Sequence, residues 1–158
     1  MGLVRSIKRK NWQKLLSEGP TPDALKDAEQ DLLPDESGDI SVYLCGDALD
    51  HLEVAVALCD GTPAWPKNFD FVEFSEEDLR ACNAGQARKT LGETRCSRVN
   101  ELHRDVRLNE AQRHCIIKSI ARQLKALGKP TVPRITDKVI RKEAPGYSWL
   151  PADSQLRR

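Results

Sequence analysis

The segment ISVYLCGDALDHLEVAVALCD, residues 40–60, decides the expected fold. Residues 40–45 alternate in polarity, which predicts a half-buried β-strand. Asp47 follows at the position of an N-cap and predicts a helix over residues 48–60. The run 54–58 is apolar almost all round, so this helix is expected to be well buried.

A second strand is predicted at residues 69–74, FDFVEF, after an expected loop at residues 62–66. Ser75 and Asp78 have the spacing of a capping box and open a helix predicted over residues 76–84. A helical crossover of this length favours a parallel, right-handed strand pair if the two strands are neighbours. No third strand is evident. The expected class is α+β, mostly helical, with a minimal strand–helix–strand unit that needs more strands or a partner chain to complete its layer.

The clearest helix is predicted over residues 109–127, NEAQRHCIIKSIARQLKAL. It begins with the capping-box spacing of Asn109 and Gln112, and Gly128 ends it. Further helices are predicted at residues 3–16, from Thr21-Pro22 onward, and at 98–107 and 135–143.

Charge divides the chain into two parts. Residues 1–85 carry 8 Lys and Arg against 17 Asp and Glu, and residues 86–158 carry 17 against 7. The formal charges are therefore −9 and +10, which add to the net +1. We interpret these as an acidic α/β part with a basic N-terminal helix and a basic helical part, within one compact unit. The asymmetry predicts either an anionic partner for the second part or pairing of the two parts with each other.

Sequence motifs of catalysis and nucleotide binding are missing. The chain contains no GxxxxGK[ST], GxGxxG, HExxH or GxSxG sequence. The five cysteines lack CxxC spacing, so buried thiols in a reducing compartment are favoured over disulfides or zinc. A polar cluster of Asp47, Asp50, His51 and Glu53 follows the first strand, where ligands often bind, but a helix cap at Asp47 and a solvated helix face explain the cluster without any chemistry. We expect no enzymatic activity, cofactor or metal.

Residues 110–158 resemble, faintly, a helix-turn-helix or winged-helix region, although the chain ends before a full recognition helix. Basic side chains there could hold phosphates without reading sequence. The residues assigned to this role are Arg113, Lys118, Arg122, Lys125, Arg134, Lys138, Arg141 and Lys142.

The expected function is therefore that of a small cytoplasmic, non-enzymatic protein-binding or adaptor protein. It is expected to self-associate or to join a complex, because its strand unit is small and its charge blocks alternate. The alternative is a nucleic-acid-binding accessory or regulator that uses the basic C-terminal helices. No apolar run reaches the roughly 20 residues of a membrane span, so no membrane partner is expected.

Overall fold

The computed structural model describes residues 1–61 and 68–157; the loop expected at 62–66 lies outside the described residues. Within them, six strands form one sheet in the order β4-β5-β2-β1-β3-β6, and each neighbouring pair is antiparallel. The strands are β1 Gly2–Ser6, β2 Ile40–Cys45, β3 Phe69–Phe74, β4 Arg88–Lys89, β5 His103–Val106 and β6 Arg134–Ile135.

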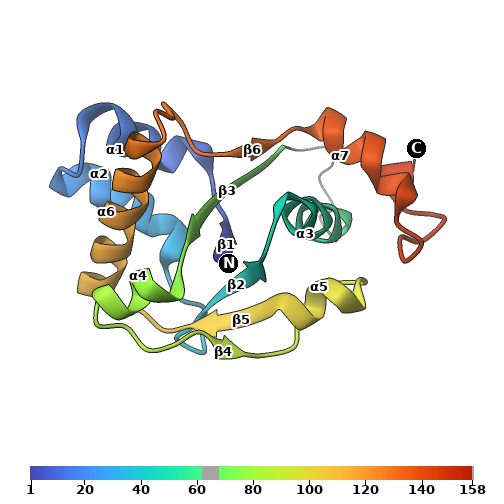
Figure 1. The fold of residues 1–158 in the computed structure, drawn as a ribbon, viewed down its shortest axis with the longest axis horizontal. Helices are drawn as coiled ribbons and strands as arrows, with labels where there is room; N and C mark the ends of the chain where they lie inside the picture. The colour runs from blue at the N-terminus through green and yellow to red at the C-terminus, as the bar shows by residue number, and fades with distance from the viewer. Residues whose placement is uncertain (62–67, 158) are drawn as a thin grey trace.

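Helices cover both faces of this sheet (Figure 1). The α-helices are α1 Gln13–Glu18, α2 Pro22–Glu29, α3 Ala48–Asp60, α4 Glu76–Ala81, α5 Ser97–Leu102, α6 Glu110–Ala126 and α7 Asp137–Glu143. Short 3-10 helices lie at η1 Arg9–Asn11, η2 Gln30–Leu32, η3 Ala144–Gly146 and η4 Gln155–Arg157.

The α+β class is confirmed, but the minimal strand–helix–strand unit is wrong. Strands β2 and β3 are not neighbours, because β1 lies between them and pairs antiparallel with both. The two predicted strands therefore run parallel to each other without pairing. The sheet is complete within one chain, so the need for a partner chain to extend it disappears.

The error originates in β1, which the sequence presents as part of a helix over residues 3–16. A central strand is buried on both faces: Leu3 packs into one core and Val4 into the other. Arg5 interrupts this apolar run, but its guanidinium donates to the carbonyls of Asp31 and Ser41 at 3.0 and 2.9 Å. A strand that is buried on both faces lacks the polar alternation of a half-buried strand, and the apolar residues of the segment 3–16 can then be fitted to one face of a helix. Helix forms only later, at η1 and α1.

Two hydrophobic cores result, one on each face of the sheet. The first joins α1, α2, α4 and α6 to the sheet, and Trp12 is fully buried in it. The second joins α3, α5 and α7 to the opposite face, around Val54 and Val99. Figure 1 shows α1, α2 and α6 together on one side of the sheet and α3 and α7 on the other.

The helix predictions hold best where a cap is present. Helix α6 opens with the expected capping box of Asn109 and Gln112, and α3 with Asp47. Helix α4 opens with the Ser75–Asp78 capping box but ends at Ala81. Asn83, two residues further on, takes the left-handed conformation at φ 57°. The predicted helix 98–107 is wrong in its second half, which forms β5.

The cysteine prediction is wrong for one pair. Cys82, at the end of α4, forms a disulfide with Cys115 of α6. The sequence separation of 33 residues hides this pairing, since only the packing of α4 on α6 brings the two together. Cys45, Cys59 and Cys96 are buried free thiols, as predicted. Burial raises the pKa of Cys45 and of Cys59 to about 12, so both are inert thiols at neutral pH.

Candidate functional site

Most arginines of the basic part form ion pairs with carboxylates of the acidic part. Glu29 pairs with Arg113, and Asp39 pairs with both Arg88 and Arg107. Three further links complete the pattern: Asp60 with Arg95, Asp70 with Arg134, and Asp50 and Glu53 with Arg98. The acidic and basic parts thus neutralise each other within one chain, which is the second of the two expectations for the charge asymmetry.

Two of the eight predicted phosphate-binding residues are engaged in this way. Arg113 is half-buried, and its Nε donates to Glu29 at 2.8 Å while Nη1 donates to the Leu108 carbonyl. Arg134 makes a bidentate pair with Asp70 at 2.7 and 3.1 Å, which raises the pKa of Arg134. Both guanidiniums hold elements of the fold together.

Three of the eight residues come together on α6. Lys118, Arg122 and Lys125 line one groove between α6 and the segment Leu15–Pro20. Lys129, just beyond the helix end, also lines it and was missed from the sequence. We call this surface the α6 basic groove; its volume is about 630 Å³. The three cations on α6 recur at i, i+4 and i+7, the spacing of one helix face, whereas Lys129 lies beyond the left-handed Gly128, so no helical spacing in the sequence indicates it.

The cations of the α6 basic groove have no carboxylate partner within the described residues. Glu18 is the one acidic side chain among its described lining residues, and Leu15, Leu16 and Ala121 form its apolar part. The groove therefore carries a net positive charge that the rest of the chain does not neutralise.

The remaining three residues, Lys138, Arg141 and Lys142, lie on α7. This helix packs on the opposite face of the sheet from α6 (Figure 1), and Arg141 pairs with Asp137 at 3.1 Å. Helices α6 and α7 are thus separated by the sheet and do not form the packed helix pair of a helix-turn-helix. A single interface cannot include all eight residues.

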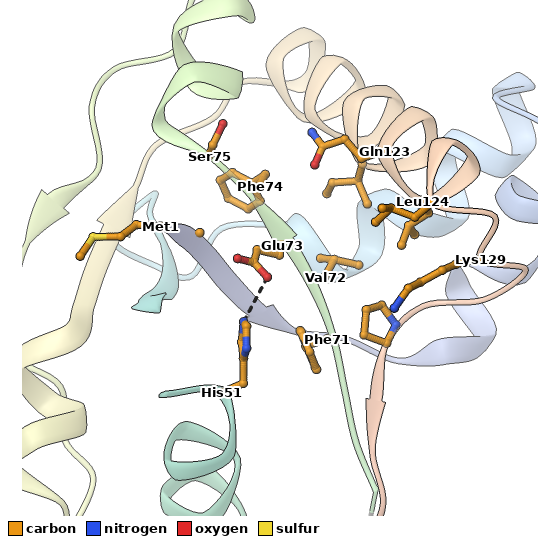
Figure 2. Close-up of a pocket in the computed structure, with 14 residues that line it drawn as sticks. Met1, His51, Phe71, Val72, Glu73, Phe74, Ser75, Gln123, Leu124 and Lys129 are labelled. Carbon is orange, nitrogen blue, oxygen red and sulfur yellow. Dashed lines mark hydrogen bonds and ion pairs between the residues drawn. The ribbon is translucent and has the colours of Figure 1, made fainter. Parts of the chain in front are cut away.

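A second surface lies along the outer edge of β3, and we call it the β3-edge groove (Figure 2). Its volume is about 360 Å³. On one side it is lined by Val72 and Phe74 of β3 and by Ile120, Leu124 and Leu127 of the α6 region. On the other side lie Phe71, Glu73 and His51. Lys129 borders this groove as well as the α6 basic groove.

The polar side of the β3-edge groove is built around Glu73. Its Oε2 lies 3.1 Å from Nε2 of His51, whose ring stacks on Phe71 at a centroid distance of 5.2 Å (Figure 2). The Glu73 carboxyl group also covers Gly2: a Cβ there would lie 1.6 Å from Oε1 of Glu73. Glycine at this position is therefore what leaves room for the His51–Glu73 pair.

The polar cluster predicted at residues 47–53 divides into separate structural roles. Asp47 caps α3 by accepting from the Asp50 amide at 2.9 Å, and Asp50 accepts from the Gly46 amide at 2.7 Å. Asp50 and Glu53 both bind Arg98 and so connect α3 to α5. His51 points instead toward Glu73. The cluster thus serves as a cap, an ion-pair network and one wall of the β3-edge groove.

Neighbouring residues His114 and Cys115 on α6 face different partners, because adjacent residues of a helix point about 100° apart. Nε2 of His114 lies 3.4 Å from Glu29, whereas Cys115 bonds to Cys82. Across the described ranges 1–61 and 68–157, no group of three potential metal-binding side chains converges, and no helix is long and apolar enough to span a bilayer.

Comparison with known proteins identifies no relative of this chain. No protein-family model matches the chain, and neither a curated protein nor a solved structure matches it.

Proposed function

We propose that this protein is a non-enzymatic accessory protein that binds nucleic acid through its phosphate backbone, with the α6 basic groove as the contact surface. The observation that carries the proposal is the row of Lys118, Arg122, Lys125 and Lys129. Arginines on other surfaces, such as Arg107, Arg113 and Arg134, form long-range ion pairs, while these four cations share one groove without a carboxylate partner among the described residues.

The length of the row favours a polyanion over a single small anion. Lys118, Arg122 and Lys125 extend over seven residues of α6, about 10 Å along the helix axis, and Lys129 follows beyond the helix end. Charges spaced along such a length match a ligand with repeated negative groups. A nucleic-acid backbone offers these at regular intervals, and its counterions are released when cations replace them.

The composition of the groove favours contact with phosphates over contact with bases. Its described lining contains no aromatic side chain on which a base could stack, because Trp12 of the same region is buried in the core. Lys and Arg on a helix surface contact phosphates without reading the sequence. We therefore propose weak, sequence-independent binding.

The acidic segment of the first part leaves this groove free. Glu29 and Asp39 pair with arginines elsewhere, and Asp31 accepts from the Trp12 indole at 2.8 Å. Asp27 lies 4.0 Å from Lys14. The full-length chain is consequently expected to bind, without removal of its acidic part.

The experiment is a salt titration of affinity for a fluorescent DNA duplex of about 20 base pairs, from about 50 to 200 mM salt. If all four cations contact phosphates, the slope of log affinity against log salt should be about −3.6. The double variant Lys118→Ala/Arg122→Ala should reduce that slope to about −1.8 and leave the melting temperature unchanged, since exposed charges contribute little to stability.

The matched control is Lys138→Ala/Lys142→Ala on α7, which removes the same charge from a different surface. Equal loss in both double variants would show that only net charge matters and would contradict the groove assignment. Poly-glutamate that competes as well as DNA would assign the groove to an acidic protein instead. Absence of binding at about 50 mM salt would end the proposal.

A further inference from the structure

The outer edge of β3 is paired over only part of its length. Strand β6 pairs with Phe69 and Asp70, and the last backbone bond of this ladder runs from the Phe71 amide to the Pro133 carbonyl at 3.2 Å. Proline has no amide hydrogen, so Pro133 cannot return a bond to the Phe71 carbonyl. The ladder ends there, three residues before β3 ends at Phe74.

The register of β1 and β3 shows which backbone groups this leaves at the edge. The Ile7 amide donates to the Asp70 carbonyl at 3.0 Å, so Asp70, Val72 and Phe74 direct their backbone groups toward β1. The alternate residues, Phe71 and Glu73, direct theirs outward. The Phe71 carbonyl and the Glu73 amide and carbonyl thus face the β3-edge groove, and no strand in the described part of the chain pairs with them.

We propose that the β3-edge groove binds an extended segment of a partner protein as an added β-strand, with an aliphatic side chain in the apolar part of the groove and a carboxylate beside Lys129. An added strand supplies donors and acceptors to the edge through its main chain, while pockets for alternate side chains give specificity. This inference does not rest on the nucleic-acid proposal, although Lys129 borders both grooves.

The side chains around the edge define what the segment should carry. An added strand alternates its side chains between the two sides of the groove. One side is apolar, formed by Val72, Leu124 and Leu127, and suits a leucine, isoleucine or valine. Lys129, without a carboxylate partner among the described residues, borders that side and favours an acidic neighbour.

A second copy of the same chain fits this edge less well. Symmetric antiparallel pairing of two β3 edges about Glu73 would place the two Glu73 carboxylates opposite each other, and like charges in that position destabilise a sheet. A separate strand that carries its own side chains avoids this repulsion.

The experiment uses the labelled full-length chain on an array of hexapeptides with one fixed leucine and varied neighbours, aspartate and lysine among them. The tightest peptide is then measured in solution by fluorescence anisotropy, and the Glu73 amide is followed by NMR. We expect peptides with an acidic neighbour to bind best, and the Glu73 amide to shift and gain protection from exchange. The control is the same peptide with alternate amides N-methylated. It cannot pair with a strand edge and should not bind.

Two leucine variants test whether the peptide binds in the β3-edge groove. Leu127 is 69% exposed and lines the groove, so Leu127→Ser should fold normally and weaken the peptide roughly tenfold. Leu91 is also 69% exposed but is not among the lining residues, so Leu91→Ser should leave affinity unchanged. Lys118→Ala should likewise leave peptide affinity unchanged.

Three results would overturn the proposal. The first is an array on which no peptide binds better than its N-methylated copy. The second is equal loss of affinity in the Leu127→Ser and Leu91→Ser variants. The third is a concentration-dependent dimer in sedimentation that Leu127→Ser dissociates, because the occupant would then be a second copy.

Discussion

At the scale of single residues, several side chains that look chemically active prove to be structural because each has a specific partner. Asp50 shows this most clearly. One of its oxygens binds Arg98 and the other accepts from the Gly46 amide. The hydrogen bond from Arg98, with that from Gly46, lowers the pKa of the Asp50 carboxyl group below its ordinary value. A carboxylate held in this way stabilises the fold only while it is ionised.

This gives a pH prediction for Asp50→Asn. Because the folded pKa is lower than the unfolded value of about 3.9, the unfolded chain binds the proton more readily. The stabilisation is therefore complete above about pH 4 and is lost as pH falls through the folded pKa. Asp50→Asn should lower the free energy of unfolding at pH 7 by about 1–2 kcal/mol and flatten its decline in acid.

Urea denaturation at several pH values between about 2 and 7 measures both effects. The control is Asp153→Asn, which changes an exposed carboxyl group near the C-terminus. If Asp50→Asn and Asp153→Asn gave the same pH profile, the Arg98 contact would contribute nothing to stability.

At the scale of elements, β1 organises the sheet because it pairs with both β2 and β3 and carries buried side chains into both cores. Val4 is 1% exposed, whereas Ser6 at the end of the same strand is exposed. Val4→Asp would bury an unpaired carboxylate, which costs several kcal/mol or forces its protonation. We expect Val4→Asp to lose cooperative thermal unfolding, as measured by circular dichroism.

Ser6→Asp places the same charge at an exposed position of β1 and should melt within a few degrees of the parent protein. This comparison separates β1 from the amphipathic helix that the sequence suggests at residues 3–16. A cooperative Val4→Asp variant with an unchanged melting temperature would show that β1 is not a core strand.

At the scale of the whole molecule, the acidic and basic parts of the chain form one structure. Both contribute strands to the same sheet, and ion pairs such as Glu29–Arg113 connect them. The Cys82–Cys115 disulfide adds a covalent link between the parts. Closing a loop of this length removes chain entropy from the unfolded state, worth about 3–4 kcal/mol in the loop-entropy account.

Reduction of this disulfide should therefore lower the free energy of unfolding by about 3–4 kcal/mol, measured by urea denaturation with and without a phosphine reductant. The double variant Cys82→Ala/Cys115→Ala should show the same loss and no further response to the reductant. The buried thiols of Cys45, Cys59 and Cys96 provide an internal check, since they should stay unlabelled by iodoacetamide until the protein unfolds. If the reductant left the free energy of unfolding of the parent protein unchanged, the disulfide would not be stabilising.

The prediction from sequence worked where local chemistry sets the structure. Caps such as Asp47 and Asn109 satisfy backbone amides within three residues, and the alternation in β2 is visible along six residues. Helical spacing also places Lys118, Arg122 and Lys125 on one face of α6, although their predicted role as phosphate contacts stays a prediction.

Only the tertiary structure shows which distant segments of the chain contact each other. The sequence by itself determined the class, the capped helices, two of the strands and the opposed charges of the two parts. It could not determine that β1 separates β2 from β3, that Cys82 meets Cys115, or which cations stay unpaired. Those outcomes depend on contacts between residues tens of positions apart. Burial on both faces removes the alternation by which a strand such as β1 is recognised. A carboxylate from one part of the chain neutralises an arginine from the other part. The two candidate surfaces, the α6 basic groove and the β3-edge groove, are what this pairing leaves unused.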